Sequence, residues 1–214
     1  AFKDVSLGAW HTCGLRTSGK LDCWGRNEHG QSVPPYGLYS QLGAGGGGHA
    51  CALRADDGEV SCWGLNNNGQ YDAPPGPYVT INSRGGHSCA VRANGRASCW
   101  GLNTTGQIEV PEGRYQVVQG GKLHSCGLKE DDTISCWGSN LETQLDHPEG
   151  KFKVVSGGWW HGCAIDLNNK LTCWGGNQFG EIDYPAGEFQ RVSAGGFHTC
   201  AITTQGEVTC WGRD

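Results

Sequence analysis

The segment GGWWHGCAIDLNNKLTCWGGNQFG, residues 157–180, contains the pattern that decides the fold. Two cysteines ten positions apart enclose an apolar segment and a polar Asn-Asn pair, and Trp-Gly directly follows the second cysteine. The same arrangement occurs five more times in the 214 residues, with a period of about 37. Because self-similarity at about 20 to 50 residues is typical of solenoids and propellers, the sequence predicts a repeat architecture.

Each copy begins with an aromatic residue, continues through His-x-Cys and closes with Cys-Trp-Gly, which in the first three copies is followed by x-Asn-x-x-Gly-Gln. The last copy stops at Cys-Trp-Gly-Arg-Asp. Six copies leave no linker, so residues 1–214 are expected to form a single domain. The predicted repeats are 2–38, 39–77, 78–114, 115–151, 152–188 and 189–214.

The composition excludes several classes of protein. A content of 37 glycines and 36% hydrophobic residues does not suit a helical core. The net charge of −5 and 16 scattered lysines and arginines disfavour nucleic acid and anionic membranes as partners. There is no apolar run long enough to span a membrane, and the absence of methionine favours a processed, secreted chain. No nucleophile elbow, phosphate loop or metalloprotease helix is present, so we expect neither an enzyme nor a cofactor.

The spacing inside one copy fits a β-hairpin. A turn near Ser18-Gly19 places Cys13 opposite Cys23 and Leu15 opposite Leu21 on one face. On the other face Trp24 lies opposite a small residue, as the later tryptophans also do. The second copy has one extra turn residue, which preserves the same pairing.

Both faces of such a hairpin are apolar, as in a sheet stacked between two neighbouring sheets. We therefore predict an all-β fold, a single six-bladed β-propeller with about 37 residues per blade. Ring closure is expected to join Phe2 and the residues after it to the last blade. A β-helix or an open solenoid is the alternative, but it would need capping ends, and the terminal copies resemble interior ones.

The paired cysteines are expected to form one disulfide per blade. Each would contribute about 2.5 to 3 kcal/mol in the chain-entropy description and implies an oxidising compartment. Zinc is the alternative, since His-x-Cys and a second Cys offer three ligands, but six identical copies without Cys-x-x-Cys favour a scaffold and no metal. We interpret the repeated histidines as structural groups that bridge loop backbone. The predicted pairs are Cys13–Cys23, Cys51–Cys62, Cys89–Cys99, Cys126–Cys136, Cys163–Cys173 and Cys200–Cys210.

The motifs GRNEHGQ, GLNNNGQ and GLNTTGQ, together with the glycine and histidine that precede each hairpin, resemble the regulator-of-chromosome-condensation repeat. The resemblance covers essentially the whole chain and implies a β-propeller, often of seven blades with about four strands each. The cysteine-bearing form also resembles the extracellular repeats of plant crinkly-type receptor kinases and of secreted bacterial proteins. Family functions include guanine-nucleotide exchange with chromatin binding, β-lactamase inhibition and receptor recognition. The exchange site is not carried over, because the chain lacks a basic tail.

Candidate binding residues lie where equivalent loops differ. Between the repeated glycine and histidine, the copies carry Trp10, Leu123, Trp159, Trp160 and Phe197. In a closed ring the aromatic residues are expected to form one platform with Leu123 at its edge, suited to a sugar or to a protein hot spot. The alternative is that these rings pack on neighbouring loops or plug the central channel.

A second series of candidates follows the Gly-Gln turn. These residues could accept hydrogen bonds from sugar hydroxyls or attract a basic partner; the alternative is that they merely satisfy turn amides and keep the surface soluble. They are expected to lie too far apart to share a calcium ion. These carboxylates are Asp72, Glu109, Asp146 and Asp183. Asn103 begins a sequon for N-glycosylation in a eukaryotic source.

We interpret the chain as a secreted, non-enzymatic recognition protein whose partner is a glycan or an extracellular protein. The first hypothesis is lectin-like carbohydrate binding through the aromatic loops. The alternative is a protein-recognition module, such as a receptor-like ectodomain or an enzyme inhibitor. A third hypothesis is a structural, self-assembling protein.

Overall fold

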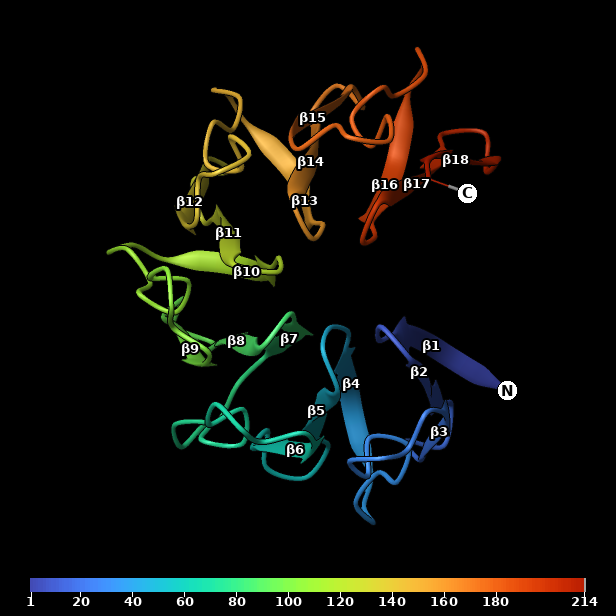
Figure 1. Cartoon of the computed structure of the whole chain (residues 1–214), viewed down its shortest axis with the longest axis vertical. Helices are drawn as coiled ribbons and strands as arrows, with labels where there is room; N and C mark the ends of the chain where they lie inside the picture. Colours follow the sequence, from blue (N-terminus) through green and yellow to red (C-terminus); the bar gives the residue numbers. More distant parts are fainter. Residues whose placement is uncertain (214) are drawn as a thin grey trace.

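The computed structural model describes residues 1–213, apart from the side chain of Ala44. In this part of the chain there are six antiparallel sheets of three strands, arranged one after another around a central axis (Figure 1). The all-β propeller fold with one sheet per repeat is therefore confirmed. Each sheet has three strands, whereas the resemblance implied about four. The described residues include no helix of the length and hydrophobicity that a membrane span requires.

The first three sheets contain β1 (Phe2–Leu7), β2 (His11–Arg16), β3 (Leu21–Gly25), β4 (Tyr39–Ala44), β5 (His49–Arg54), β6 (Val60–Gly64), β7 (Thr80–Arg84), β8 (His87–Val91) and β9 (Ala97–Gly101). The last three contain β10 (Tyr115–Gly120), β11 (His124–Lys129), β12 (Ile134–Gly138), β13 (Phe152–Gly157), β14 (His161–Asp166), β15 (Leu171–Gly175), β16 (Phe189–Ala194), β17 (His198–Thr203) and β18 (Val208–Gly212). The first strand of each sheet lies nearest the axis (Figure 1).

The predicted hairpin register is confirmed in every sheet. In the first, Cys13 pairs with Cys23, Leu15 with Leu21 and Thr12 with Trp24. All six predicted disulfides form, with Cα–Cα distances of 4.0 to 4.1 Å. The disulfides thus link the second strand of each sheet covalently to the third.

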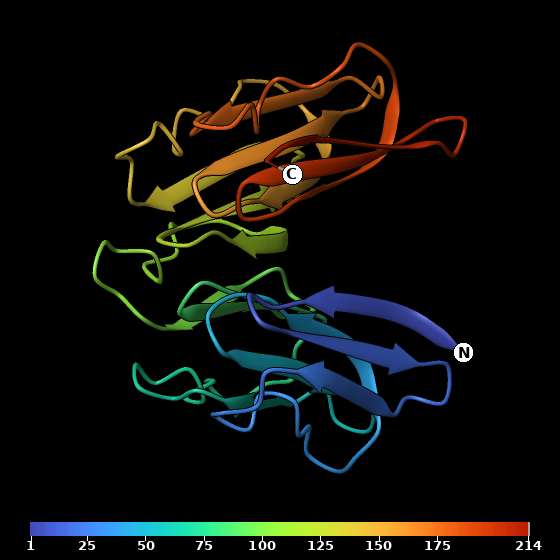
Figure 2. The same ribbon diagram turned by 45° about the vertical axis from the view of Figure 1, so that its right-hand side comes forward.

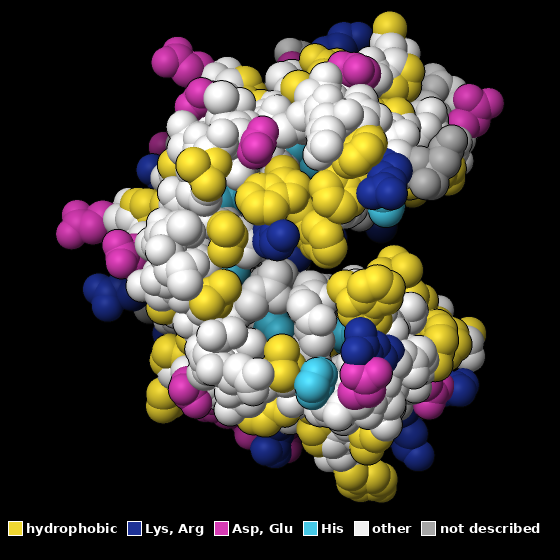
Figure 3. All heavy atoms as spheres, in the orientation of Figure 1, with side chains coloured by type: hydrophobic (Ala, Val, Ile, Leu, Met, Phe, Trp, Pro, Cys, Tyr) yellow, Lys and Arg dark blue, Asp and Glu magenta, His cyan; other side chains and the backbone are white. Residues whose placement is uncertain are grey.

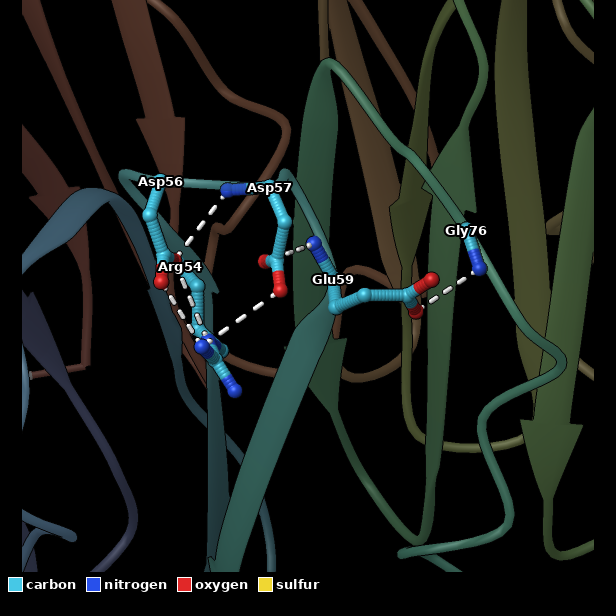
Figure 4. A network of polar contacts seen from close by, with 5 residues as sticks. All are labelled: Arg54, Asp56, Asp57, Glu59 and Gly76. Atoms are coloured by element: carbon cyan, nitrogen blue, oxygen red, sulfur yellow. Dashed lines mark hydrogen bonds and ion pairs between the residues drawn. The ribbon is translucent and has the colours of Figure 1, made fainter.

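The longer turn of the second repeat is held by its own charges. The Arg54 guanidinium donates to Asp56 and also lies 3.4 Å from the Asp57 carboxylate (Figure 4). Glu59 accepts a hydrogen bond of 2.8 Å from the backbone N–H of Gly76, in the loop that leads to the third sheet. The extra residue is therefore accommodated without changing the pairing of Cys51 with Cys62.

Neighbouring sheets pack by one rule. The cystine and aliphatic pair of one sheet contact the first aromatic residue and the Cys-Trp-Gly tryptophan of the next, as Cys13 and Leu15 contact Tyr39 and Trp63. The indole N–H then donates to a backbone carbonyl in the Gly-Gln turn of the preceding repeat; Trp137 donates to Gln107 over 3.0 Å. The repeated tryptophans were expected to lie in the core, and Trp63, Trp100, Trp137 and Trp174 are buried. For Trp24 the expectation was wrong: it is 47% exposed, because no described sheet packs on its side of the first sheet.

The repeated histidines have a different partner from the expected loop backbone. Nε2 of His49, His87 and His161 lies 2.9, 2.9 and 2.7 Å from the hydroxyl of Ser88, Ser125 and Thr199 in the next sheet. The expectation of a backbone bridge was wrong because the imidazole points across the interface between sheets, a direction that in-sheet spacing does not reveal. His11 and His124 lack such a partner, because the equivalent residues, Ala50 and Gly162, have no hydroxyl.

These hydroxyls can be tested one by one. Ser125→Ala removes the partner of His87 and a bond to the Gln107 carbonyl, so we expect a loss of about 1 to 3 kcal/mol in the free energy of unfolding. Ala50→Ser supplies a hydroxyl to His11 and should stabilise the protein by about 0.5 to 1.5 kcal/mol. Urea unfolding measures the free energy of unfolding of both variants. A change of the same sign in both would contradict the histidine–hydroxyl hydrogen bond between sheets.

The ring does not close as the sequence predicted. Inner strands pack against each other from β1 through β16, whereas among the described residues β1 and β16 make no comparable contact. An opening separates the first sheet from the last (Figures 1 and 2). The expectation failed because the rotation between neighbouring sheets, which their packing sets, does not complete a circle in six steps.

Candidate functional site

The loops that join the first and second strands of each sheet gather at one end of the ring and hold one another in place. Backbone hydrogen bonds run from Ala9 to Gly46 and from Gly47 to Gly85, at 2.9 and 2.7 Å. On the other side of the opening, Lys122 donates to Trp159 and Trp159 to Gly195, both at 3.1 Å. These loops carry the predicted binding residues, so their backbone is fixed by the fold.

Three aromatic rings from the fifth and sixth repeats pack together here. The Trp159 and Phe197 ring centroids are 5.3 Å apart at 71°, and Phe179 meets Phe197 at 5.3 Å and 80°, both edge-to-face. Such pairs contribute about 0.5 to 1.5 kcal/mol beyond area burial. With Trp10 and Trp160 they form what we name the aromatic face: Trp10, Trp159, Trp160, Phe179 and Phe197. Phe179 reaches it from the turn after the fifth sheet.

Two cations lie on these rings. The Lys122 ammonium is 4.6 Å from the Trp160 centroid and 5.4 Å from that of Trp159. The Arg213 guanidinium lies 4.9 Å from Phe179 and 5.8 Å from Phe197. Cation–π contacts at exposed sites are worth about 0.5 to 1 kcal/mol each. Two basic side chains therefore lie over rings of the aromatic face, although the whole chain has a net charge of −5.

Two hollows lie beside these residues. One, of about 300 Å³, is lined by Trp10, Leu65, Leu102, Lys122, Leu123 and Trp159 together with loop glycines. The other, of about 660 Å³, lies in the opening and is shared by Trp10, Trp159, Phe197, Arg84 and Arg213. Neither lining contains an aspartate or glutamate. Figure 3 shows hydrophobic and basic side chains on both sides of the central hollow.

The predicted platform is present in two parts. Trp159 and Phe197 are in contact, Trp160 lies beside them under Lys122, and Leu123 lines the smaller hollow as an edge residue. Trp10 is 64% exposed and lines both hollows, but it makes no ring contact with the others among the described residues. The opening between the first and last sheets separates it from them.

The predicted carboxylates are not brought together. Glu109, Asp146 and Asp183 each accept a hydrogen bond from an asparagine amide of their own turn, at 3.3, 3.2 and 2.9 Å. Asp72 has its backbone N–H bonded to Gly69 in the equivalent turn. Of the two interpretations, stabilisation of the turn is the one that these contacts support.

The sequon residue Asn103 is exposed in one of these turns. Its amide donates to Glu109, and its carbonyl oxygen lies 3.5 Å from the backbone nitrogen of Ile108. Glycosylation at this residue stays a prediction.

Arg84 is a residue that the sequence reasoning missed. Its guanidinium donates to the carbonyls of Gly157 and Ala194, so it crosses the centre of the ring from the third sheet to the fifth and sixth. Burial lowers its pKa to about 10, which leaves it charged at neutral pH. A signal was present: three residues before the repeated histidine, the other copies have glycine, at Gly8, Gly46, Gly121, Gly158 and Gly195.

The fold, the repeat and the loop-borne aromatic cluster define a disulfide-bridged β-propeller of repeated three-stranded sheets. The regulator of chromosome condensation (RCC1) repeat matches residues 2–31, 40–70, 85–107, 152–181 and 189–214. The chain belongs to this repeat family, as the motifs predicted.

Solved structures show the same architecture. The entire ectodomain of the receptor kinase CR4 of Physcomitrella patens is 29% identical over 99% of this chain, with a TM-score of 0.85, and the chain covers 61% of that ectodomain. The crinkly WD40 ectodomain of the Arabidopsis thaliana receptor kinase ACR4 is 26% identical over 99% of this chain, which covers 80% of it, with a TM-score of 0.83. The chain thus spans less than two thirds of the first of these relatives.

A more distant structure shares the fold alone. Prp20p of Saccharomyces cerevisiae is 17% identical over 98% of this chain, which covers 71% of it, with a TM-score of 0.81. No curated protein sequence matches the chain. The six disulfides and the likeness to ectodomains are both typical of an extracellular environment.

Proposed function

We propose that this chain is an extracellular, non-enzymatic recognition module that binds a protein partner through the aromatic face. The observation that carries the proposal is the cluster of Trp159, Phe179 and Phe197, held by edge-to-face contacts on loops that are hydrogen-bonded to each other. Rigid aromatic side chains lose little conformational entropy on binding and dominate protein hot spots. The likeness to two receptor-kinase ectodomains supports a protein partner.

The charge of the face narrows the kind of partner. Lys122 and Arg213 lie on the rings, and no carboxylate lines either adjacent hollow. A partner segment that combines apolar side chains with carboxylates matches this surface, because opposite charges speed encounter and fix orientation. Binding should weaken as ionic strength rises.

Carbohydrate binding is the second candidate, favoured by the partly exposed Trp159 and Trp160. The carboxylates support this candidate less than the sequence suggested. Three of the four that were proposed to accept hydrogen bonds from sugar hydroxyls instead accept them from asparagines of their own turns. A glycan array tests it directly. Selective sugar binding that Trp159→Ala abolishes would favour this candidate over the protein partner.

Binding through the face is tested with two paired variants. The double variant Trp159→Ala, Trp160→Ala should lose about 2 kcal/mol or more of binding free energy towards a captured extracellular partner, measured by calorimetry. Leu141→Ala is the control, because Leu141 is 82% exposed in a turn and belongs to no part of the aromatic face. Equal affinity of the double variant and the control for the partner would contradict the proposal.

A further inference from the structure

The loop glycines of the second and third repeats form the floor of the smaller hollow. Directly before the repeated histidine, these two copies carry Gly48 and Gly86. The other four carry Trp10, Leu123, Trp160 and Phe197. Two neighbouring loops at this end of the ring therefore lack a side chain where the others have a large apolar one. The hollow of about 300 Å³, which we name the glycine hollow, lies over them.

The backbone does not require glycine at residue 48. Its φ angle lies outside the left-handed region that favours glycine. A Cβ added there would meet only side chains, Leu65 at 3.4 Å and His29 at 3.8 Å, which are ordinary van der Waals distances. Glycine at this residue therefore leaves space open and is not needed for the turn itself.

The side chains that line the glycine hollow are mostly apolar. They include Trp10, Leu65, Leu102, Leu123 and Trp159. Leucine follows Trp-Gly only in the second and third copies, the same two that carry glycine before the histidine. In these copies the apolar side chain thus borders the hollow and leaves its floor open. Figure 3 shows white backbone and uncharged polar groups recessed between hydrophobic and basic side chains at the centre of the ring.

The backbone of the floor is already hydrogen-bonded within the chain. The carbonyls of Gly48 and Gly86 accept from the backbone N–H groups of Leu65 and Leu102, each over 2.9 Å. Burial of an unpaired backbone group would oppose the binding of an apolar ligand. Because these two acceptors have their partners, an apolar group can cover the floor without this cost.

One cation borders the glycine hollow. The Lys122 ammonium lies on the rings of Trp160 and Trp159, and the residue also lines the hollow. None of the ion pairs among the described residues involves Lys122. No aspartate or glutamate lines the hollow. The positive charge is therefore available to a carboxylate of a ligand.

We infer that the glycine hollow is the pocket for one large apolar side chain of the protein partner, with an aspartate or glutamate next to it in the partner's sequence that pairs with Lys122. The inference rests on the proposed function, because it specifies which part of the partner enters this end of the ring. An apolar side chain seated in a pocket supplies much of the affinity of an interface. The adjacent carboxylate fixes its orientation.

A peptide library tests the inference on the full, disulfide-bonded chain. Random dodecapeptides are displayed on phage through their C-termini, so that their carboxylates come only from side chains. Sequences selected on the native chain should share a large apolar residue beside aspartate or glutamate. A synthetic peptide of such a sequence should bind at least about tenfold more tightly than the same peptide with alanine at the apolar position.

A variant that fills the hollow locates the binding site of the apolar residue. Gly48→Trp installs the residue that the first and fifth copies already carry at this place, and it should weaken peptide binding at least about tenfold. The alanine peptide should bind this variant and the native chain equally, because the two changes remove the same contact. Leu141→Trp is the matched control, since Leu141 is 82% exposed and lines neither hollow.

A charge reversal provides a second test that does not depend on filling the hollow. Lys122 is exposed, so Lys122→Glu should leave the fold intact. It should weaken binding of the selected peptide several-fold, and the same peptide with lysine in place of its acidic residue should regain the lost affinity. Calorimetry measures all of these affinities.

Three results would overturn the inference. One is a selection that yields no binding peptide, or peptides without the apolar and acidic pair. Another is equal affinity of a selected peptide for the native chain and for Gly48→Trp. If Trp160→Ala then weakens binding, the proposed function stands without this pocket, because Trp160 belongs to the aromatic face and does not line the glycine hollow. If neither variant changes the affinity, both proposals fail. The third is a failure of the charge-reversed peptide to regain affinity for Lys122→Glu.

Discussion

Acid is expected to destabilise this protein from about pH 6.5 down to about pH 4, a loss that begins above the range in which most carboxylates titrate. Burial lowers the pKa of His49, His87 and His124 to about 3 and that of His161 to about 4, from 6.5 for the free side chain. Burial lowers the pKa of His11 as well. Over this interval the unfolded chain binds protons that the folded protein does not, so the free energy of unfolding falls as the pH falls.

The hydrogen bonds explain why the neutral form is required. The hydroxyls of Ser125 and Thr199 donate hydrogen bonds to the backbone carbonyls of Gln107 and Glu181. They therefore accept a hydrogen bond from the Nε2–H of the histidine in the preceding sheet, His87 and His161 respectively. Nδ1 is then a bare lone pair, buried without a partner in His49, His87 and His161. Protonation there would place a buried N–H with no acceptor next to it, in addition to a desolvated charge.

Each histidine that binds a proton only on unfolding adds about 1.4 kcal/mol per pH unit to the slope of the free energy of unfolding against pH. Where all five behave in this way, the slope is roughly 7 kcal/mol per pH unit. Urea titrations at half-unit steps between pH 7.5 and 4.5 measure the slope. His124→Gln should reduce it by one histidine's share, because the His124 nitrogens have no partner to lose. His147→Gln is the control. Stability that is independent of pH in this interval would refute the assignment.

The second large effect concerns one tryptophan. Trp137→Ala is expected to lower the free energy of unfolding by about 3 to 5 kcal/mol, because the ring is 6% exposed and its removal leaves a cavity. The ring packs in a cluster with Cys89, Val91, Tyr115 and Val118, and its N–H bond to Gln107 would also be lost. This single change would thus uncouple the third sheet from the fourth.

Trp24→Ala is the matched control for Trp137→Ala. Trp24 occupies the same place in its repeat and also contacts the first aromatic ring of its sheet, at 6.0 Å from Phe2. It is 47% exposed, however, and its indole N–H donates no hydrogen bond to any of the described residues. We expect a loss of about 1 kcal/mol. Denaturant unfolding compares the two variants, and a similar loss in both would mean that sheet-to-sheet packing is not what holds the tryptophans.

The register of each sheet was predictable because it depends only on spacing within one repeat. Cys13 and Cys23 fix which residues lie opposite each other, and an extra turn residue before Cys62 leaves the rule unchanged. The opening was not predictable in this way. It depends on the angle between adjacent sheets, which arises from the shapes of packed side chains and is not encoded in any local spacing.

The candidate site was predictable only in part, because comparing equivalent positions of the repeats reveals loop residues but not contacts between distant repeats. Trp159 and Phe197 differ from the equivalent residues of other copies, and this difference marked them correctly as loop residues at one end of the ring. Arg84 escaped because its partners are carbonyls in the fifth and sixth sheets, far along the chain. The hydroxyl partners of the histidines escaped likewise, since each lies in the next repeat.

The position of the disulfides has a mechanical consequence. Each one joins two strands of the same sheet, at a sequence separation of 10 or 11, and among the described residues no cystine connects one sheet to another. Tension applied between the chain ends would pass through the sulfur atoms and bypass every hairpin tip. Stretching would therefore separate the sheets one at a time, while the disulfide keeps the loop between the second and third strands of each sheet closed. When the tension is released, the two strands of each hairpin would still be held together.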